Sequence, residues 1–92
     1  MEENEQPKSP LEAFQKLAAQ APENVMVRYS LGLEYLKANR NAEAEGEFRE
    51  VLHLKPDYSA AYRELGKVLS ALERFSEAKV IYEKGLDVAC QK

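Results

Sequence analysis

The sequence predicts an all-α fold in which five helices stack as antiparallel pairs, in about two and a half repeats. Three observations lead to this prediction: the chain resembles itself at an offset of 34 residues, its apolar residues recur at helical spacing, and no segment alternates as a strand does. At this offset Leu31 aligns with Leu65, and Phe48 aligns with Tyr82. A chain of 92 residues has room for one such domain and little room for a deep active site.

The repeat also predicts how the chain is divided. We expect residues 1–8 to form a disordered acidic tail and residues 9–92 to fold as one domain. Within that domain, residues 9–24 form a capping half-repeat, residues 25–58 the first full repeat and residues 59–92 the second.

The opening helix is predicted by its N-terminal residues. Ser9 is placed to cap it, Pro10 is a favoured first residue, and Glu12 completes a capping box. The predicted helix runs from Pro10 to Gln20 and carries one apolar stripe and one polar face. A polar outer face is typical of the end of a stacked array.

Each full repeat is predicted to contain two helices. In the first repeat, apolar residues at helical spacing from Met26 to Leu36 indicate one helix, and an asparagine-containing turn separates it from a second at about Ala42–Leu54. Pro56 cannot continue that second helix. The second repeat predicts helices at about Ala60–Leu72 and Ser76–Ala89.

Composition and charge argue against several classes of partner. The formal net charge is −3, from 13 basic and 16 acidic residues, so we expect no nucleic-acid partner. No apolar run approaches the ~20 residues of a membrane helix, and the acidic start does not resemble a secretory signal. The single cysteine, Cys90, cannot form an internal disulfide, which fits a cytoplasmic location.

The residues that could carry chemistry do not form a recognisable reaction centre. His53 is the one histidine, whereas a metal site usually has three or four ligands, so we predict no metal site. His53 and Cys90 could nominally act as base and nucleophile, but they lie on helices of different repeats with no evident oxyanion site. Without a glycine-rich phosphate loop or a nucleophile elbow, we predict no catalytic residue and no cofactor.

The repeated residues resemble the signature of the tetratricopeptide repeat (TPR) family, which is W-x2-L-G-x2-Y…A-x3-F…P with a period of 34. The first full repeat matches at Leu31-Gly32-x2-Tyr35, Ala44-x3-Phe48 and Pro56, and the second at Tyr62-x2-Leu65-Gly66 and Ala78-x3-Tyr82. The resemblance implies a right-handed stack of helix pairs, an α-solenoid. It also implies a non-catalytic scaffold or adaptor that binds a peptide or protein partner.

The small residues of this signature are expected to permit close packing. Gly32 and Gly66 each cost about 1 kcal/mol relative to alanine inside a helix, which is tolerable where two helices approach closely. We expect Ala44 and Ala78 to supply the facing small surface.

Three positions depart from the family pattern. Arg28 stands where a large aromatic residue is preferred, Leu69 where tyrosine is preferred and Cys90 where proline is preferred. None of them interrupts the helical periodicity, so the fold prediction stands and only the packing of the ends is open.

The resemblance further implies a concave groove lined by the first helix of each repeat. Carried onto this sequence, the peptide-binding residues are Met26, Tyr29, Leu33, Lys37, Arg63 and Lys67. This set combines an apolar patch with two cations one helical turn apart, so a ligand with an apolar anchor and a nearby acidic group would complement it. Packing against the opening helix is an alternative role for Tyr29 and Leu33.

The last helix suggests a different function, self-association as a homodimer. Leu86 and Val88 are the equivalents of Leu52 and Leu54, and with Ile81 they would leave apolar surface where stacked arrays normally end in a polar cap. Either the sequence belongs to a longer protein, or a partner or a second copy covers this face. A self-complementary contact through Ile81, Leu86 and Val88 would favour a twofold dimer.

Overall fold

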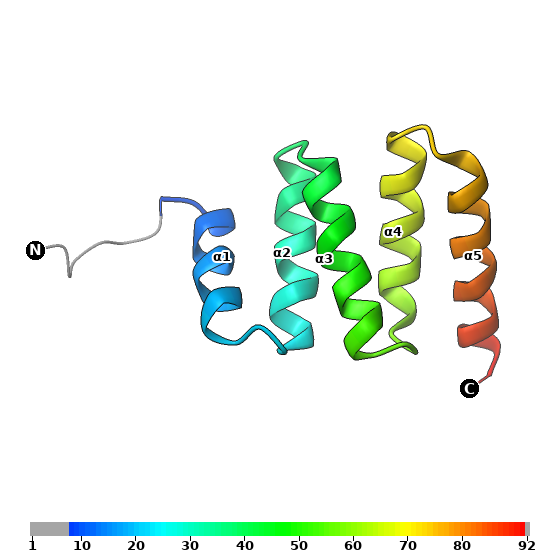
Figure 1. The fold of residues 1–92 in the computed structure, drawn as a ribbon, viewed down its shortest axis with the longest axis horizontal. Coiled ribbons are helices and arrows are strands. Elements are labelled where there is room, and N and C mark those ends of the chain that lie inside the picture. Colours follow the sequence, from blue (N-terminus) through cyan, green and yellow to red (C-terminus); the bar gives the residue numbers. More distant parts are fainter. Residues whose placement is uncertain (1–7, 92) are drawn as a thin grey trace, which may run out of the picture.

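The structure, a computed structural model, describes residues 8–91, and these residues form five α-helices joined by short turns (Figure 1). The helices are α1 (Pro10–Gln20), α2 (Val25–Lys37), α3 (Asn41–Leu54), α4 (Ser59–Ala71) and α5 (Phe75–Cys90). Each packs against the helix that follows it, and α1 and α5 lie at opposite ends of the row.

This arrangement confirms the predicted all-α stack of five helices, and the described residues contain no strand. Within residues 8–91 no helix combines the length and apolar character needed to cross a bilayer. The disorder expected for residues 1–8 lies, apart from Lys8, outside the described part of the chain.

The start of α1 follows the predicted capping pattern with one difference. The Ser9 hydroxyl oxygen accepts a hydrogen bond from the Glu12 amide at 3.2 Å. The Glu12 carboxylate reaches back to the amide of Lys8, at 2.6 Å, one residue before the cap. The first bond satisfies an amide that the first turn of α1 leaves without an intrahelical partner, and the second ties the residue before the cap to the same turn.

The first helix of each full repeat ends in the same way. Asn39 (φ 61°) and Glu73 (φ 63°) both adopt the left-handed conformation just after the helix. In each case the next residue, Arg40 or Arg74, donates its amide to a carbonyl five residues back, at 2.9 and 2.8 Å. These bonds form a Schellman motif, which reverses the chain direction between the paired helices.

The core lies along the middle of the row, where α3 and α4 are covered on both sides. Its largest fully buried side chains are Phe48, Val51, Leu65, Val68 and Leu69. Burial of a side chain of this size contributes roughly 1.5–3 kcal/mol, so these five residues account for a large part of the driving force for stacking.

The two signature glycines occupy equivalent surroundings, each beside an aromatic ring. A Cβ atom on Gly32 would lie 2.7 Å from the Phe48 ring, and one on Gly66 would lie 2.4 Å from the Tyr82 ring. Ala44 and Ala78 are both buried, but the atoms nearest to each glycine belong to an aromatic ring. The ring occupies the space that a side chain on the glycine would fill. The two helices can therefore approach each other closely.

Candidate protein-binding surfaces

Four of the six predicted groove residues come together on one surface formed by α2 and α4. Met26 and Tyr29 lie on α2, Arg63 and Lys67 lie on α4, and Tyr58, just before α4, connects the two helices. With Glu64 they form what we call the α2–α4 surface.

Aromatic rings form the centre of this surface. The Tyr29 ring lies 5.7 Å from that of Phe48 and 5.1 Å from that of Tyr58, both in tilted arrangements. The Tyr58 hydroxyl donates to the sulfur of Met26 at 3.8 Å. Burial and the nearby Glu64 carboxylate raise the pKa of Tyr29, so its phenol stays neutral at physiological pH.

The charged residues form ion pairs in which the carboxylate side chains are largely buried and the cationic side chains are exposed. Glu64 lies 3.2 Å from the Lys67 ammonium and 3.8 Å from the Arg63 guanidinium, and its side chain is only 10% exposed. The two basic side chains are 58% and 65% exposed. Lys37 pairs with Glu34 at 3.2 Å and is likewise the exposed partner. A molecule approaching the surface therefore meets the cations first.

The remaining predicted residues take different positions. Leu33 is half-buried and packs against the core, and Tyr29 is likewise partly buried against it. Lys37 lies two helical turns beyond Tyr29 at the other end of α2. Sequence reasoning missed Tyr58, although it lies between Asp57 and the predicted helix, because the turn was interpreted only as a helix stop.

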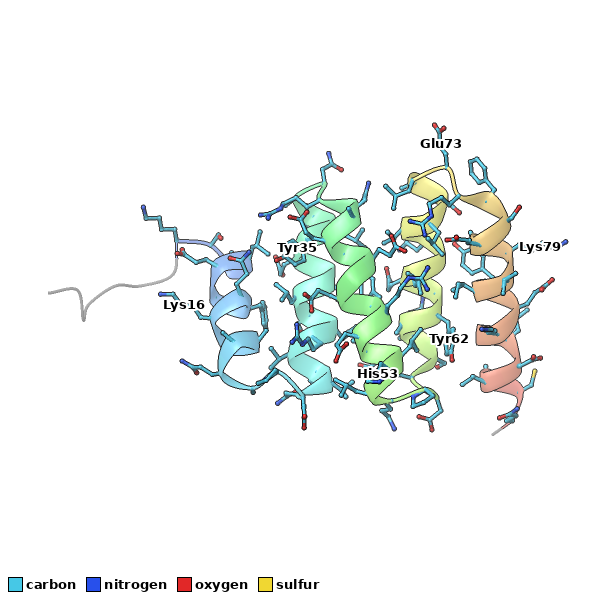
Figure 2. The ribbon with its side chains drawn as sticks, viewed as in Figure 1. Lys16, Tyr35, His53, Tyr62, Glu73 and Lys79 are labelled. Carbon is cyan, nitrogen blue, oxygen red and sulfur yellow. The ribbon has the colours of Figure 1, made fainter. Side chains whose placement is uncertain are left out.

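A well-formed hollow lies elsewhere, between α4 and α5. We call it the end hollow; its volume is about 460 Å³ and its lining residues are Ser59, Tyr62, Arg63, Tyr82, Gly85, Leu86 and Ala89. Tyr62 projects from α4 into the space beside α5 (Figure 2). Its hydroxyl donates to the carbonyl of Pro56 at 2.6 Å, so the ring is held in place.

Exposure along α5 corrects part of the predicted self-association surface. Leu86 is 66% exposed, as expected for an uncovered helix, and Val88 is half-buried. Ile81 is only 8% exposed and belongs to the core, so the expectation that it adds to the exposed apolar face is wrong. Ile81 points inward with Ala78, one turn earlier on the same side of α5.

A third region contains a network of ion pairs between α3 and the start of α5. Glu45 on α3 accepts from Arg49 at 2.9 Å and from Arg74 at 2.7 Å, and Arg74 also pairs with Glu77 at 2.6 Å. Arg49 and Glu77 border a second, more open hollow of about 380 Å³. The network joins the two full repeats, and its groups satisfy one another.

The groups considered for chemistry remain on the surface. The His53 side chain is 80% exposed at the end of α3, and its nearest acid, Glu50, lies 3.9 Å away (Figure 2). Cys90 is exposed on α5. Within residues 8–91, no three or more His, Cys, Asp or Glu side chains are grouped to hold a metal ion.

Comparison with known proteins identifies the repeat. Two family models described as tetratricopeptide repeat match residues 35–89 and 3–59. The chain is 30% identical over 79 residues to a TPR repeat-containing protein of Pseudomonas aeruginosa, covering 86% of this chain and 75% of that protein.

Solved structures of MamA share the fold. A MamA point mutant superposes with a TM-score of 0.82 at 26% identity, covering 85% of this chain and 57% of that one. A second MamA structure superposes with a TM-score of 0.84 at 22% identity, covering 88% and 47%. The present chain thus spans about half the length of these MamA chains.

The 34-residue period, the equivalent glycine–aromatic contacts and the family matches all agree. The described helices are also stacked as this architecture requires, each against its neighbours. The chain belongs to the tetratricopeptide repeat family, a fold that is typically non-catalytic and generally mediates interactions between proteins.

Proposed function

We propose that this chain is an adaptor that binds a peptide or protein segment on the α2–α4 surface. The segment carries an apolar anchor beside an acidic residue. The proposal rests chiefly on one observation: Arg63 and Lys67 are exposed, the Glu64 carboxylate paired with them is largely buried, and an aromatic cluster lies on the same surface.

The apolar anchor of the ligand would contact Met26 and the two neighbouring tyrosines. Met26 is 64% exposed although it is a large apolar residue, and its flexible thioether adapts to differently shaped partners. Tyr29 and Tyr58 provide ring surface that is already ordered by stacking, so little rotamer freedom is lost on binding. Binding hot spots are enriched in tyrosine for these reasons.

The acidic group of the ligand would contact Arg63 and Lys67. These two cations share the single carboxylate of Glu64, which leaves one net positive charge among the three groups. A ligand carboxylate adds the missing charge and so completes the pairing. Such contacts mainly set orientation and association rate, and they weaken as salt is added.

The test is fluorescence anisotropy with two labelled peptides that differ only in whether the residue beside a leucine–phenylalanine anchor is glutamate or lysine. The acidic peptide is expected to bind more tightly, and the difference should shrink at high salt. Tyr29→Ala and the double change Arg63→Glu, Lys67→Glu should each weaken its binding by at least about tenfold.

A matched control is the double change Lys79→Glu, Lys84→Glu. Both lysines are exposed on α5, and the change in net charge is the same as on α4. If this control weakens binding as much as the α4 change does, the ligand responds to overall charge and the α2–α4 surface is not its site. Equal binding of the two peptides would also contradict the proposal.

A further inference from the structure

The end hollow corresponds, residue for residue, to a surface that is covered within the same chain. Subtracting the 34-residue offset maps its lining onto α2 and α3, at Val25, Arg28, Tyr29, Phe48, Val51, Leu52 and Lys55. There α4 packs against α3, and both Phe48 and Val51 are fully buried. Among residues 8–91 no helix covers their counterparts at the end hollow, and Tyr82 is 38% exposed.

We propose that the end hollow is a docking site for one amphipathic helix of a partner protein, lying against α5 as α4 lies against α3. The helix α4 shows the face that such a partner needs. Its fully buried apolar residues are Ala61, Leu65, Val68 and Leu69, a small residue followed by larger ones at i+4, i+7 and i+8. This spacing produces a single apolar stripe on a helix. The docking site shares Arg63 with the α2–α4 surface but is otherwise lined by different residues, and it stands independently of the function proposed for that surface.

One difference between the repeats refines the chemistry of the partner helix, and another does not. At the floor of the hollow Gly85 takes the place of Val51, but a Cβ atom there would lie 2.7 Å from the Tyr62 Cβ, so this glycine makes room for Tyr62 of α4. At the rim Arg63 takes the place of Tyr29, whose ring contacts Tyr58 immediately before α4. Because Arg63 is 65% exposed, the partner helix would pair with it through an acid near its own N-terminus, where acids are favoured.

A second copy of this chain fits the hollow less well than a partner does. The apolar stripe of α4 already lies in the core, as does the buried part of α2, so neither is available to a neighbouring copy. Among the described helices α5 has an uncovered apolar face, but it is interrupted by the exposed charges of Lys79, Glu83 and Lys84. Lys79 points away from the molecule into solvent (Figure 2).

The probe is a helix-stapled, fluorescein-labelled peptide with the sequence of residues 58–73 and the change Tyr58→Glu, which supplies the acid for Arg63. It is titrated into the whole chain by anisotropy, and amide shifts are followed by NMR. Binding is expected, with shifts centred on Tyr62, Gly85 and Leu86. A peptide that also carries Leu65→Glu, which places a charge in the stripe, should not bind.

Two protein variants locate the site. Leu86→Lys should weaken binding of the peptide at least about tenfold, and circular dichroism should show an unchanged fold because Leu86 is largely exposed. Tyr29→Ala, on the α2–α4 surface, should leave the affinity unchanged. This control separates failure of the present proposal from failure of the peptide-binding function.

Three results would overturn the proposal. The first is the absence of saturable binding by the stapled peptide, and the second is a set of shifts centred on the α2–α4 surface. The third is sedimentation of the whole chain as a dimer that Leu86→Lys converts to a monomer, which would make a second copy the occupant.

Discussion

Among residues 8–91, Asn39 and Glu73 are the two residues with a side chain whose backbone is left-handed. They stand at equivalent places in the two repeats, where the Schellman turn requires a positive φ. Asparagine tolerates this conformation, whereas for most other residues it costs roughly 1–2 kcal/mol. The second repeat therefore stores strain that the first largely avoids.

Glu73→Gly is expected to stabilise the fold by about 1 kcal/mol, because relief of the left-handed strain exceeds the entropy that glycine loses on folding. Glu73 lies exposed at the tip of the turn, so no packing is lost (Figure 2). Urea denaturation measures the effect, with Asn39→Gly as the matched control that should gain less. An equal gain at both sites would contradict the strain argument.

The two signature glycines differ in how their aromatic partners can respond to a side chain. The built Cβ is closer to the ring at Gly66 than at Gly32, 2.4 Å against 2.7 Å. However, Phe48 is fully buried, whereas Tyr82 is 38% exposed beside the end hollow. A buried ring has no space to move into, and the exposed ring can rotate toward solvent.

Gly32→Ala is therefore expected to destabilise the chain by about 1–2 kcal/mol, since overpacking exceeds the gain in helix propensity. Gly66→Ala should change the free energy of unfolding by less than about 0.5 kcal/mol, despite the shorter distance. Thermal denaturation of the two variants, side by side, measures the difference. The reverse order would show that distance alone decides the penalty and that Tyr82 is fixed.

At the scale of the elements, the ion-pair network couples α3 to the start of α5. Burial on its own would raise the pKa of Glu45, but hydrogen bonds from Arg74 and Arg49 outweigh it and hold the pKa below the ordinary value of 4.5. A carboxylate with a lowered folded-state pKa adds stability above that ordinary value. This stability is lost as the pH falls through the folded-state pKa.

Glu45→Gln is expected to destabilise the chain by about 1 kcal/mol near neutral pH, because two hydrogen-bonded guanidinium groups lose their shared anion. The difference from the parent chain should shrink as the pH falls through the lowered pKa of Glu45, where this carboxylate takes up a proton. Urea titrations at a series of pH values measure it. Glu83→Gln, a change at an exposed carboxylate on α5, serves as the control. An equal pH dependence for this variant would contradict the assignment of the effect to Glu45 and its two arginines.

The boundaries of the elements follow closely from the sequence because local signals mark them. Ser9 and Pro10 start α1 where the capping pattern predicts, and α3 ends at Leu54, shortly before Pro56. The starts of α3, α4 and α5 lie one residue earlier than predicted. These three helices lack a side-chain cap hydrogen bond, so no capping side chain marked their first residues.

At the scale of the whole molecule, the sequence predicted least about contacts between residues that are far apart along the chain. The helical period placed Met26 and Tyr29 on one face, but it could not show that Tyr58 would stack on them, since that contact depends on the angle at which α4 docks. Likewise, the sequence placed Ile81 on the final helix without fixing which side of it faces the core. The end hollow is lined entirely by residues of the second repeat, and it depends on how α4 and α5 pack against each other.

The stacked architecture makes a final prediction about equivalent leucines. Leu52 on α3 packs against the core, whereas Leu86 occupies the same place on α5 and is 66% exposed. Leu→Ala changes helix propensity equally at both sites, so the difference between the variants isolates the cover that the neighbouring helix provides. Leu52→Ala should destabilise the chain by about 2 kcal/mol and Leu86→Ala by less than about 0.5 kcal/mol, measured by urea denaturation. If the two changes are equally destabilising, Leu86 is covered in solution, and repeating the measurement at several protein concentrations would show whether a second copy covers it.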